Sequence, residues 1–559
     1  MTFVITARCC NDASCVPVCP VNCIHPAPGE PGYLTTEMLF IDPESCIECS
    51  ACVQVCPVDA IKAEEDLEGA ETQYLDINAA FYARNPLESF GDPPVPARSD
   101  VDVRGLRVAV VGSGPAGSYA AAALLDRPGV EVDLYERLLT PYGLVRFGIA
   151  PDHQQTKKVV QAYPYNAMRG LRLRLGVEVG TQITHEELSR YYHGVIYAVG
   201  ADSDRRLSIP GEDLAGSYSA TDFVGWYNGH PARADLAVDL SECRRVVIVG
   251  NGNVALDLAR VLAGDVDRLA ATDIADHALQ VLRDSAVEEV VVLGRRGAAQ
   301  AAFTTPELLD LLELPGVEVV VDPQDLELDE HTAAQEASGT LDLTVARKLA
   351  VLREIADRPA GEASTGYRRI VLRFLASPTE VLGGDGVDKV EIVRNRLTVD
   401  PDGSVTAVPS GETEVLEAQL VLRSVGYRGQ PIPGLPFDER RGTVPHEHGR
   451  VRAESGGDAG TYVTGWIKRG PTGVVGTNKH CASETVAALL EDWAAGALTP
   501  PSGSLDELDA LLAERGVVPL GLPEWSRIDA AERNAGASAG RPRVKLVTTV
   551  DLVAAASAD

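Results

Sequence analysis

The stretch VAVVGSGPAGSYAAAALL, residues 108–125, has three glycines in a GxGxxG pattern between an apolar β-branched run and an alanine-rich run. This order predicts a buried parallel strand, a tight turn and a helix, as in dinucleotide-binding folds. Gly112 permits the turn, Gly114 lets the backbone approach a pyrophosphate, and Gly117 lets the helix pack on the strand. The N-terminus of the helix then faces the phosphates.

An acidic residue ends the next predicted strand, VDLYE, nineteen residues past Gly117. Glu136 therefore stands where a carboxylate accepts a hydrogen bond from a ribose 2′-OH. A negative charge here suits FAD or NAD and repels a 2′-phosphate. The alternative is a glycine-rich turn in an ordinary α/β core, and the complete order of strand, turn, helix and acid argues against it.

A second glycine fingerprint lies about 138 residues further on, in VVIVGNGNVALDLARVL, with Gly250, Gly252 and, in third position, Ala255. The following strand, VVVLGRRG, carries Arg295 and Arg296 where the first site has a glutamate. Guanidinium groups bind a 2′-phosphate bidentately, so we expect this site to prefer NADPH to NADH. An exposed, merely solvated arginine pair is the alternative, and the interval exceeds the usual twenty residues.

Nine of the eleven cysteines lie between Cys9 and Cys56. The second half of this block, CIECSACVQVCP, reads C-x2-C-x2-C-x3-C-P. Zinc sites use CxxC pairs that close one tetrahedral site. The run is instead that of bacterial ferredoxins, in which three cysteines bind one cluster and the fourth binds the other. It therefore predicts iron–sulfur clusters, with ligands Cys46, Cys49, Cys52 and Cys56.

The first half of the block, CCNDASCVPVCPVNC, contains an incomplete copy of the run. Read back from Cys19, Cys15 takes the third place and Cys9 the first, but Asp12 occupies the second. Interleaving the two runs predicts two ligand sets. Cluster one has Cys9, Cys15 and Cys56, with Asp12 facing the fourth iron, and cluster two has Cys19, Cys46, Cys49 and Cys52.

Asp12 determines what cluster one contains. A carboxylate is a harder ligand than a thiolate and holds iron less firmly. We therefore expect cluster one to be [3Fe–4S], or [4Fe–4S] with a labile, Asp-ligated corner, beside a [4Fe–4S] cluster two. Cys10 is an alternative ligand to Asp12. The block resembles bacterial seven-iron ferredoxins, which often keep an extra cysteine at the position of Cys23.

A third glycine-rich segment, GWIKRGPTGVVGTN (465–478), lets main-chain N–H groups approach a flat ring and predicts the far wall of a flavin pocket. Other long motifs are YERLLTPYGLVRFGIAPDH and GRRGAAQAAFTTPEL. With VVGSGPAG and GNGNVALDLAR, these segments resemble adrenodoxin reductase and the adrenodoxin-type ferredoxin–NADP reductases of actinobacteria. The resemblance covers the chain from about Leu106 to its end.

The resemblance implies site residues by motif position. His153, in APDH, matches a histidine near the flavin, as a catalytic group or as a structural hydrogen-bonding partner. Asp310 stands where relatives usually carry a glutamate, which leaves its role open. The implied FAD contacts are Gly112, Gly114, Ala116, Gly117, Glu136, Leu144, Val179, Trp466, Gly473, Val474 and Val475. The implied NADP contacts are Asn251, Gly252, Asn253, Val254, Arg295, Arg296, Glu307 and Gly473.

Together these patterns predict a multidomain chain. An α+β bacterial ferredoxin-like domain precedes an α/β reductase with two Rossmann-type domains, of the adrenodoxin and glutathione reductase-like class. The predicted boundaries are a ferredoxin-like domain at 1–75, a linker at 76–104, the first part of the FAD-binding domain at 105–205, the NADP-binding domain at 206–425, and the second FAD part with a helical C-terminal region at 426–559.

Composition limits the partners. The net charge of −31 argues against nucleic-acid binding. Residues 1–100 hold 16 acidic and 4 basic side chains, as expected for a redox module that docks on basic surfaces. No apolar run is long enough to span a bilayer, and the N-terminus does not have the pattern of a signal peptide. We therefore expect no membrane span and a cytoplasmic location.

The sequence thus predicts a ferredoxin–NADP+ reductase. Electrons pass from NADPH through FAD to the fused clusters and on to a separate redox protein, such as another ferredoxin, a monooxygenase or a biosynthetic reductase. Reverse flow uses the same parts. Two alternatives stay open: an electron-feeding subunit of the glutamate synthase type, and a non-enzymatic redox sensor that reports through the labile cluster one.

Overall fold

The computed structural model describes residues 2–90, 101–358, 368–400, 403–452 and 460–558. The stretch 108–125 forms β5 (Arg107–Val111) and α3 (Pro115–Leu125). β5 lies inside a seven-stranded sheet in the order β20-β21-β22-β8-β5-β6-β7, whose central pairs are parallel. We call this part the FAD domain, after the cofactor that the sequence predicts for it. Its other strands are β6 (Glu131–Glu136), β7 (Leu171–Leu175), β8 (Gly194–Tyr197), β20 (His446–Glu447), β21 (Arg450–Val451) and β22 (Thr461–Val463).

The second fingerprint forms β11 (Arg245–Val249) and α8 (Asn253–Ala263). β11 is central in a six-stranded parallel sheet in the order β10-β18-β11-β12-β14-β13, which we call the NADP domain. Its other strands are β10 (Ser217–Ser219), β12 (Glu289–Leu293), β13 (Val317–Val321), β14 (Arg368–Arg373) and β18 (Leu420–Arg423). An antiparallel sheet extends it, with β15 (Ala376–Leu382), β16 (Lys389–Val399) and β17 (Val405–Glu417).

The chain enters and leaves the NADP domain at one place, where β9 (Ser203–Asp204) pairs with β19 (Tyr427–Arg428). Helices cover both large sheets, and α3 packs on α15 (Thr477–Ala494). The predicted C-terminal helical region contains α16 (Leu505–Glu514), α17 (Leu522–Ser538) and α18 (Thr549–Ala556). The two large domains also contain α4 (Leu144–Phe147), α5 (Gln154–Lys157), α6 (His185–Ser189), α7 (Ala220–Tyr227), α9 (Val266–Ala270), α10 (Asp276–Arg283), α11 (Thr305–Leu312), α12 (Glu330–Ala337), α13 (Leu343–Ala356) and α14 (Trp466–Arg469).

The N-terminal module has two small sheets, β1 (Phe3–Ile5) with β4 (Ile61–Ala63) and β2 (Ile24–His25) with β3 (Phe40–Ile41). A short helix, α1 (Ala51–Val55), carries Cys52, and α2 (Gln73–Arg84) packs on β1 and β3. The buried Asn78 of α2 joins these strands, because its side chain donates to Ile5 O at 2.9 Å and accepts from Ile41 N at 2.8 Å.

The position of α2 differs from the predicted linker. Tyr74, Ile77 and Tyr82 form one buried apolar face of α2, so residues 76–84 belong to the module. Residues 91–100, which make up half of the remaining linker, lie outside the described residues. The rest of the predicted boundaries stay predictions, although the strands of the three parts fall within them.

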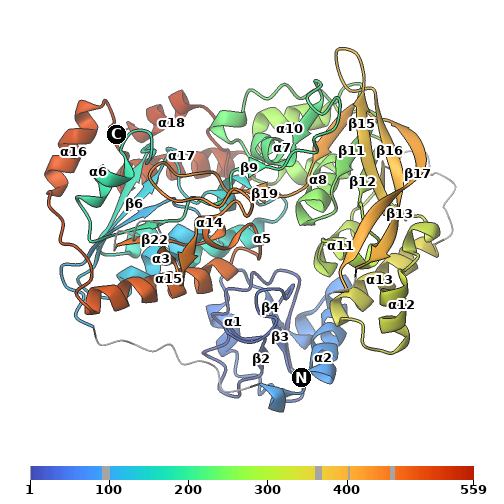
Figure 1. The fold of residues 1–559 in the computed structure, drawn as a ribbon, viewed down its shortest axis with the longest axis horizontal. Helices are drawn as coiled ribbons and strands as arrows, with labels where there is room; N and C mark the ends of the chain where they lie inside the picture. Colours follow the sequence, from blue (N-terminus) through green and yellow to red (C-terminus); the bar gives the residue numbers. More distant parts are fainter. Residues whose placement is uncertain (1, 91–100, 359–367, 401–402, 453–459, 559) are drawn as a thin grey trace.

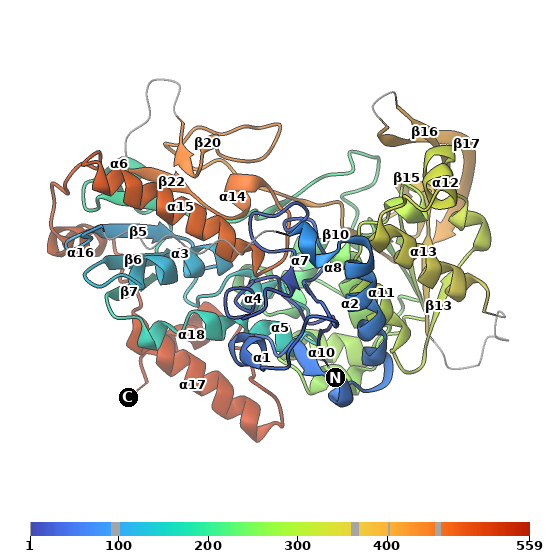
Figure 2. The ribbon, with the colours of Figure 1, turned by 90° about the horizontal axis from the view of Figure 1, so that it is seen from below.

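The module lies against both Rossmann domains (Figures 1 and 2). Lys158 of the FAD domain forms an ion pair with Asp59 of the module at 2.7 Å. On the other side, Glu37 accepts a hydrogen bond from Thr305 N, at the start of α11, at 3.0 Å. Arg84 donates to Leu341 O of the NADP domain at 2.6 Å. The module therefore bridges the two domains.

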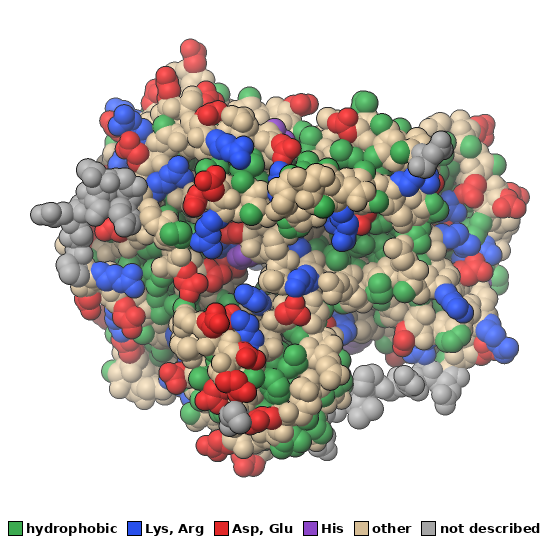
Figure 3. Space-filling model, turned by 180° about the vertical axis from the view of Figure 1, so that it is seen from behind, with side chains coloured by type: hydrophobic (Ala, Val, Ile, Leu, Met, Phe, Trp, Pro, Cys, Tyr) green, Lys and Arg blue, Asp and Glu red, His purple; other side chains and the backbone are tan. Residues whose placement is uncertain are grey.

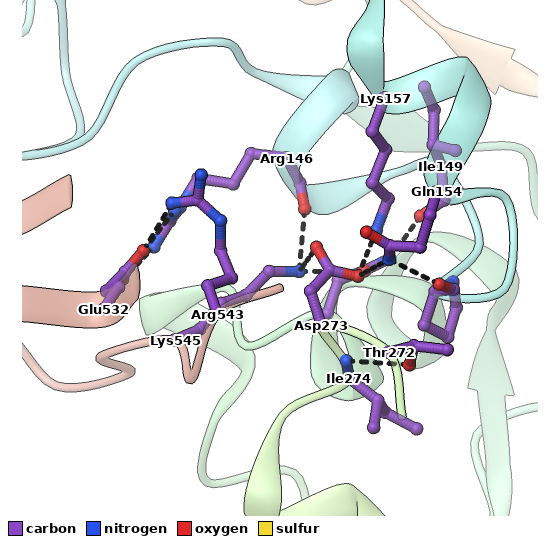
Figure 4. A network of polar contacts seen from close by, with 12 residues as sticks. Arg146, Ile149, Gln154, Lys157, Thr272, Asp273, Ile274, Glu532, Arg543 and Lys545 are labelled. Carbon is purple, nitrogen blue, oxygen red and sulfur yellow. Dashed lines mark hydrogen bonds and ion pairs between the residues drawn. The ribbon is translucent and has the colours of Figure 1, made fainter. Parts of the chain in front are cut away.

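A buried polar network joins the C-terminal region to both domains (Figure 4). The Lys545 ammonium is fully buried and lies 3.1 Å from Asp273 Oδ2 of the NADP domain. Lys157 of the FAD domain contacts the other oxygen of Asp273 at 2.6 Å. Arg146 of α4 forms a buried ion pair with Glu532 of α17. Charges that would be costly alone are thus paired across three segments.

Candidate cofactor and iron–sulfur sites

The first glycine loop has the geometry that a pyrophosphate needs. Gly112 has φ +103°, and a Cβ on it would lie 2.5 Å from Ala198 O. A Cβ on Gly117 would overlap the carbonyl oxygen of Gly112, so helix and strand pack as closely as predicted. A Cβ on Gly114 would meet no atom within 4 Å. Gly114 therefore faces open space at the start of α3, and the loop fits a dinucleotide.

Glu136 ends β6 beside this loop. Its carboxylate is buried and accepts hydrogen bonds from Ser113 N at 3.1 Å and Ser113 Oγ at 2.7 Å. Leu138 N donates to its other oxygen at 3.1 Å. The acid is thus held in place next to the phosphate loop, as a ribose-binding carboxylate must be.

Two of the other implied FAD contacts, Leu144 and Val179, lie in separate segments that follow β6 in the chain. A Cβ on Gly143 would lie 3.0 Å from Gly114 Cα, which puts Leu144 next to the loop. Val177 N donates to the main-chain oxygen of Glu136 at 2.9 Å, and the half-buried Val179 follows two residues later.

The segment 465–478 reaches this loop from the C-terminal part of the chain. A Cβ on Gly465 would lie 2.5 Å from the Ala116 side chain, at the first turn of α3. Trp466 follows and donates from Nε1 to Thr472 O at 3.2 Å, just before the turn at Gly473, Val474 and Val475. Only the tertiary structure brings these two parts of the pocket together.

The second loop repeats the geometry of the first. Gly250 has φ +112°, and a Cβ on Gly252 would meet no atom within 4 Å. Asn251 O accepts from Phe303 N at 2.9 Å. Asn253 Oδ1 accepts from Thr304 N at 2.8 Å, and Val254 follows in the first turn of α8. The loop is therefore tied to the segment that precedes α11.

Arg295 and Arg296 follow the carboxyl end of β12, which pairs with β11, the strand before the second loop. Arg295 is exposed and Arg296 is half-buried. Among the described residues, neither guanidinium takes part in an ion pair. The burial of Arg296 and the nearby charge of Arg295 lower the pKa of Arg296. Two adjacent positive charges without a carboxylate fit a phosphate group.

A cavity of about 430 Å³ lies where the module meets both domains, and His153 lines it. His153 Nδ1 is 4.0 Å from Glu307 Oε1, and His153 Nε2 is 3.8 Å from Asp310 Oδ2. Burial and the charge of Glu307 raise the pKa of Asp310 to about 6. Glu307 and Asp310 therefore lie on opposite sides of the His153 ring, one beside each ring nitrogen.

Sequence reasoning missed Arg260, which organises these acids. It is buried and forms ion pairs with Asp152 at 2.5 Å and Glu307 at 3.0 Å, and with Asp257 of its own helix. Burial and Glu307 raise the pKa of Asp257 to about 6. An arginine within the apolar run LARVL was the available signal, because a buried guanidinium needs acidic partners.

Two small cysteine-lined cavities lie in the module. One is lined by Cys9, Cys10, Asp12, Cys15 and Cys56. The other is lined by Cys19, Cys23, Cys46, Cys49 and Cys52. Each cavity brings together the four residues predicted for one cluster and one spare cysteine. The donor sets fit iron–sulfur clusters, although the ligands themselves stay predictions.

The thiols of the two cavities differ in their surroundings: Cys49 is exposed, and a hydrogen bond with the Cys23 side chain lowers the pKa of Cys19 to about 5. Burial raises the pKa of Cys9 to about 12 and that of Cys52 to about 11. Such thiols become thiolates when a cation compensates the charge, as iron does in a cluster. In the first cavity, Asp12 Oδ1 accepts from Ser14 N at 3.1 Å, and Lys479 Nζ lies 3.4 Å from Asp12 Oδ2. Lys479 had no sequence signal.

Comparisons with known proteins define the class first. Residues 106–324 match the pyridine nucleotide-disulphide oxidoreductase family, and residues 39–62 match the 4Fe-4S binding domain family. The chain is therefore an oxidoreductase with a fused iron–sulfur domain.

Full-length relatives then show to which family of oxidoreductases the chain belongs. The probable ferredoxin/ferredoxin–NADP reductase of Mycobacterium tuberculosis is 48% identical over 567 residues, which cover 100% of this chain and 95% of the relative. The NADPH:adrenodoxin oxidoreductase of Salvelinus fontinalis is 41% identical over 461 residues, 81% of this chain and 91% of the relative. The chain belongs to the ferredoxin/ferredoxin–NADP reductase family, which confirms the predicted resemblance and fold class.

A solved structure agrees with this assignment. The structure of Mycobacterium tuberculosis FprA in complex with NADPH matches with a TM-score of 0.75 and 46% identity, over 81% of this chain and all of the other.

Within the described parts of the chain, none of the helices combines the length and apolar character needed to cross a membrane.

Proposed function

We propose that the chain transfers electrons from NADPH to a separate redox protein through FAD and two iron–sulfur clusters. The observation that carries this proposal is the docking of the module, with its two cysteine-lined cavities, against both nucleotide-binding domains. Fusion makes the transfer intramolecular and independent of the concentration of a separate ferredoxin. Cysteine ligands of this kind need a reducing compartment, so we place the activity in the cytoplasm.

When bound, the cofactors would supply the redox chemistry that converts one NADPH and two oxidised one-electron acceptors into NADP+, one proton and two reduced acceptors. The chain positions them. Glu136 holds the FAD ribose beside the Gly114 loop, and Arg295 and Arg296 hold the 2′-phosphate of NADPH. His153 is our candidate for holding a proton, because carboxylates lie beside both of its ring nitrogens.

We assign [3Fe–4S] to cluster one and [4Fe–4S] to cluster two. Both oxygens of the Asp12 carboxylate are engaged, one by Ser14 N and the other by the Ser14 hydroxyl and Lys479. A carboxylate tied in this way is a poor ligand for a fourth iron. Cluster two has four thiolates available: Cys19, Cys46, Cys49 and Cys52.

The acceptor that fits this module has a basic surface. Acidic side chains gather over the module, at the bottom of the view in Figure 3. Cys49, which lines the cluster-two cavity, is exposed, and Ile47 beside it is 58% exposed. An exposed apolar residue next to a cluster and within an acidic surface is typical of a transient redox interface.

Stopped-flow reduction with NADPH and with NADH tests the proposal, with flavin and cluster absorbance followed separately. We expect NADPH to reduce the flavin first and the clusters next, and NADH to react far more slowly. A reduced flavin beside oxidised clusters would overturn the proposal. If the protein copurifies with a large partner and the isolated chain does not oxidise NADPH, a glutamate synthase-type subunit would be favoured. Negligible reduction of cytochrome c by the holoprotein would favour a redox sensor.

A further inference from the structure

The loop that lines the cluster-one cavity touches the segment 465–478 backbone to backbone. Gly476 N donates to Cys10 O at 2.8 Å. A Cβ on Gly476 would overlap Cys10 O and Asp12 N, and it would lie 2.6 Å from Asn11 C. No side chain therefore separates the two segments at this point. Gly476 directly follows Val475, an implied FAD contact.

The first turns of α15 hold the same loop through side chains. Lys479 Nζ donates to Ser14 Oγ at 2.5 Å and lies 3.4 Å from Asp12 Oδ2. His480 packs edge-on against Tyr33, with ring centres 5.8 Å apart, and the Tyr33 hydroxyl donates to Asn11 O at 2.9 Å. The reductase thus fixes the cluster-one loop by charge, aromatic packing and a main-chain hydrogen bond.

The two cysteine-lined cavities differ in how they meet the FAD domain. Cys10 is part of the apolar core of that domain, and Cys9, Cys56 and Val475 pack against the same core. Across the described part of the chain, the four predicted ligands of cluster two contribute to no such core of the reductase. Cys49 is exposed. One cavity faces the reductase, and the other faces away from it.

We propose that the module receives electrons through its cluster-one side, with Gly476 and Lys479 as positioning residues, and that cluster two passes them outward. Gly476 sets the closest approach of the two segments. Lys479 adds a positive charge beside cluster one, which favours the reduced form because that form carries one more negative charge. Each step moves one electron, so the donor is oxidised and the acceptor reduced by one unit. The inference rests on the proposed function.

Gly476→Ala tests the distance. The backbone of Gly476 has φ −71° and ψ −26°, which alanine adopts without strain, so the methyl group acts only by displacing the module. We expect electron transfer from flavin to clusters to slow roughly tenfold or more, because the rate depends steeply on separation. The NADPH-to-flavin phase of the same stopped-flow trace is the internal reference. Unchanged transfer to the clusters would overturn the role of Gly476.

Lys479→Gln tests the charge, and Lys158→Gln is the matched control. Lys158 also joins the module to the FAD domain, and the two lysine side chains are equally exposed, at 39%. Reduction potentials are measured by electron paramagnetic resonance on the holoprotein. We expect Lys479→Gln to make the potential of cluster one more negative and to leave that of cluster two unchanged, and Lys158→Gln to change neither. Equal effects of the two variants would overturn the assignment.

Freeze-quenched wild-type samples give the order directly. After mixing with NADPH, the signal of cluster one should change before that of cluster two, and the reverse order would refute the inference. If NADPH reduces the flavin but neither cluster, the proposed function itself is wrong. If the wild type reduces both clusters and the Gly476 and Lys479 variants behave like it, the proposed function stands and the positioning roles of these two residues are wrong.

Discussion

Glu532→Gln perturbs the ion pair that joins the C-terminal region to Arg146 of α4. The Arg146 side chain is 5% exposed and that of Glu532 is fully buried. Glu532 also accepts from Arg543 Nη1 and from Leu546 N, both at 2.9 Å. Glutamine keeps the volume of the side chain but removes its charge. Arg146 then loses its ion-pair partner, whereas Arg543 keeps Asp529 at 2.9 Å.

Breaking a buried pair by neutralising one partner costs about 3–5 kcal/mol. Glutamine still offers one acceptor, and Arg543 stays paired, so we expect the low end of this range, about 3 kcal/mol of unfolding free energy. With an m value of about 3 kcal/mol per M in urea, the midpoint falls by about 1 M. Because Arg146 lies two residues after Leu144, we also expect weaker retention of FAD.

Urea unfolding followed by tryptophan fluorescence measures this change, since Trp525 lies 5.9 Å from the Arg146 guanidinium. Arg533→Gln is the control on the same helix. Arg533 is 60% exposed and pairs with Asp529, and exposed pairs of this kind contribute about 0.2–1 kcal/mol. If Glu532→Gln and Arg533→Gln destabilise the protein equally, the network does not stabilise the fold in the way we describe.

Three further predictions concern the NADP site, the buried His230 and cluster one. Replacing Arg295 and Arg296 with alanine should raise the KM for NADPH roughly 30-fold, from about 2 kcal/mol of lost charge-assisted hydrogen bonds, and leave that for NADH unchanged; equal changes would show that the pair does not bind the 2′-phosphate. Burial lowers the pKa of His230 to about 4, so between pH 6.5 and about 4 the unfolded chain binds more protons than the folded one. The free energy of unfolding should therefore fall as the pH falls through this window, and His230→Asn should flatten the slope in urea unfolding. Electron paramagnetic resonance of the oxidised protein as isolated should show a three-iron signal, and a silent sample that gives only four-iron signals on reduction would contradict the assignment of cluster one.

Local motifs let the sequence predict both nucleotide loops. Gly117 is required because a Cβ there would overlap the carbonyl oxygen of Gly112 within the same strand–turn–helix unit, and Gly112 is required because the turn gives it φ +103°. These two constraints lie within one short segment, whereas the contact of Gly112 with Ala198 depends on the neighbouring strand. The cysteine runs are informative for a similar reason. Each run has fixed spacings because its first three positions face one cluster and the fourth faces the other, so Asp12 was recognisable as the residue in a cysteine's place.

The linker shows where local patterns mislead. The predicted linker began at residue 76, yet Ile77 and Tyr82 bury one face of α2 on the module. A single helix turned toward a small core gives a weak apolar signal, because most of its surface stays in water.

Only the tertiary structure determined how the parts meet. Lys479 reaches Asp12 from a position 467 residues away, and Arg146 meets Glu532 across 386 residues. Such pairs depend on the relative placement of folded domains, and no spacing within either segment encodes that placement. By itself, therefore, the sequence determined the nucleotide loops and the candidate cluster ligands. The tertiary structure decided that the module docks with its cluster-one loop against Gly476. This docking is the basis for the direction from which we propose that electrons arrive.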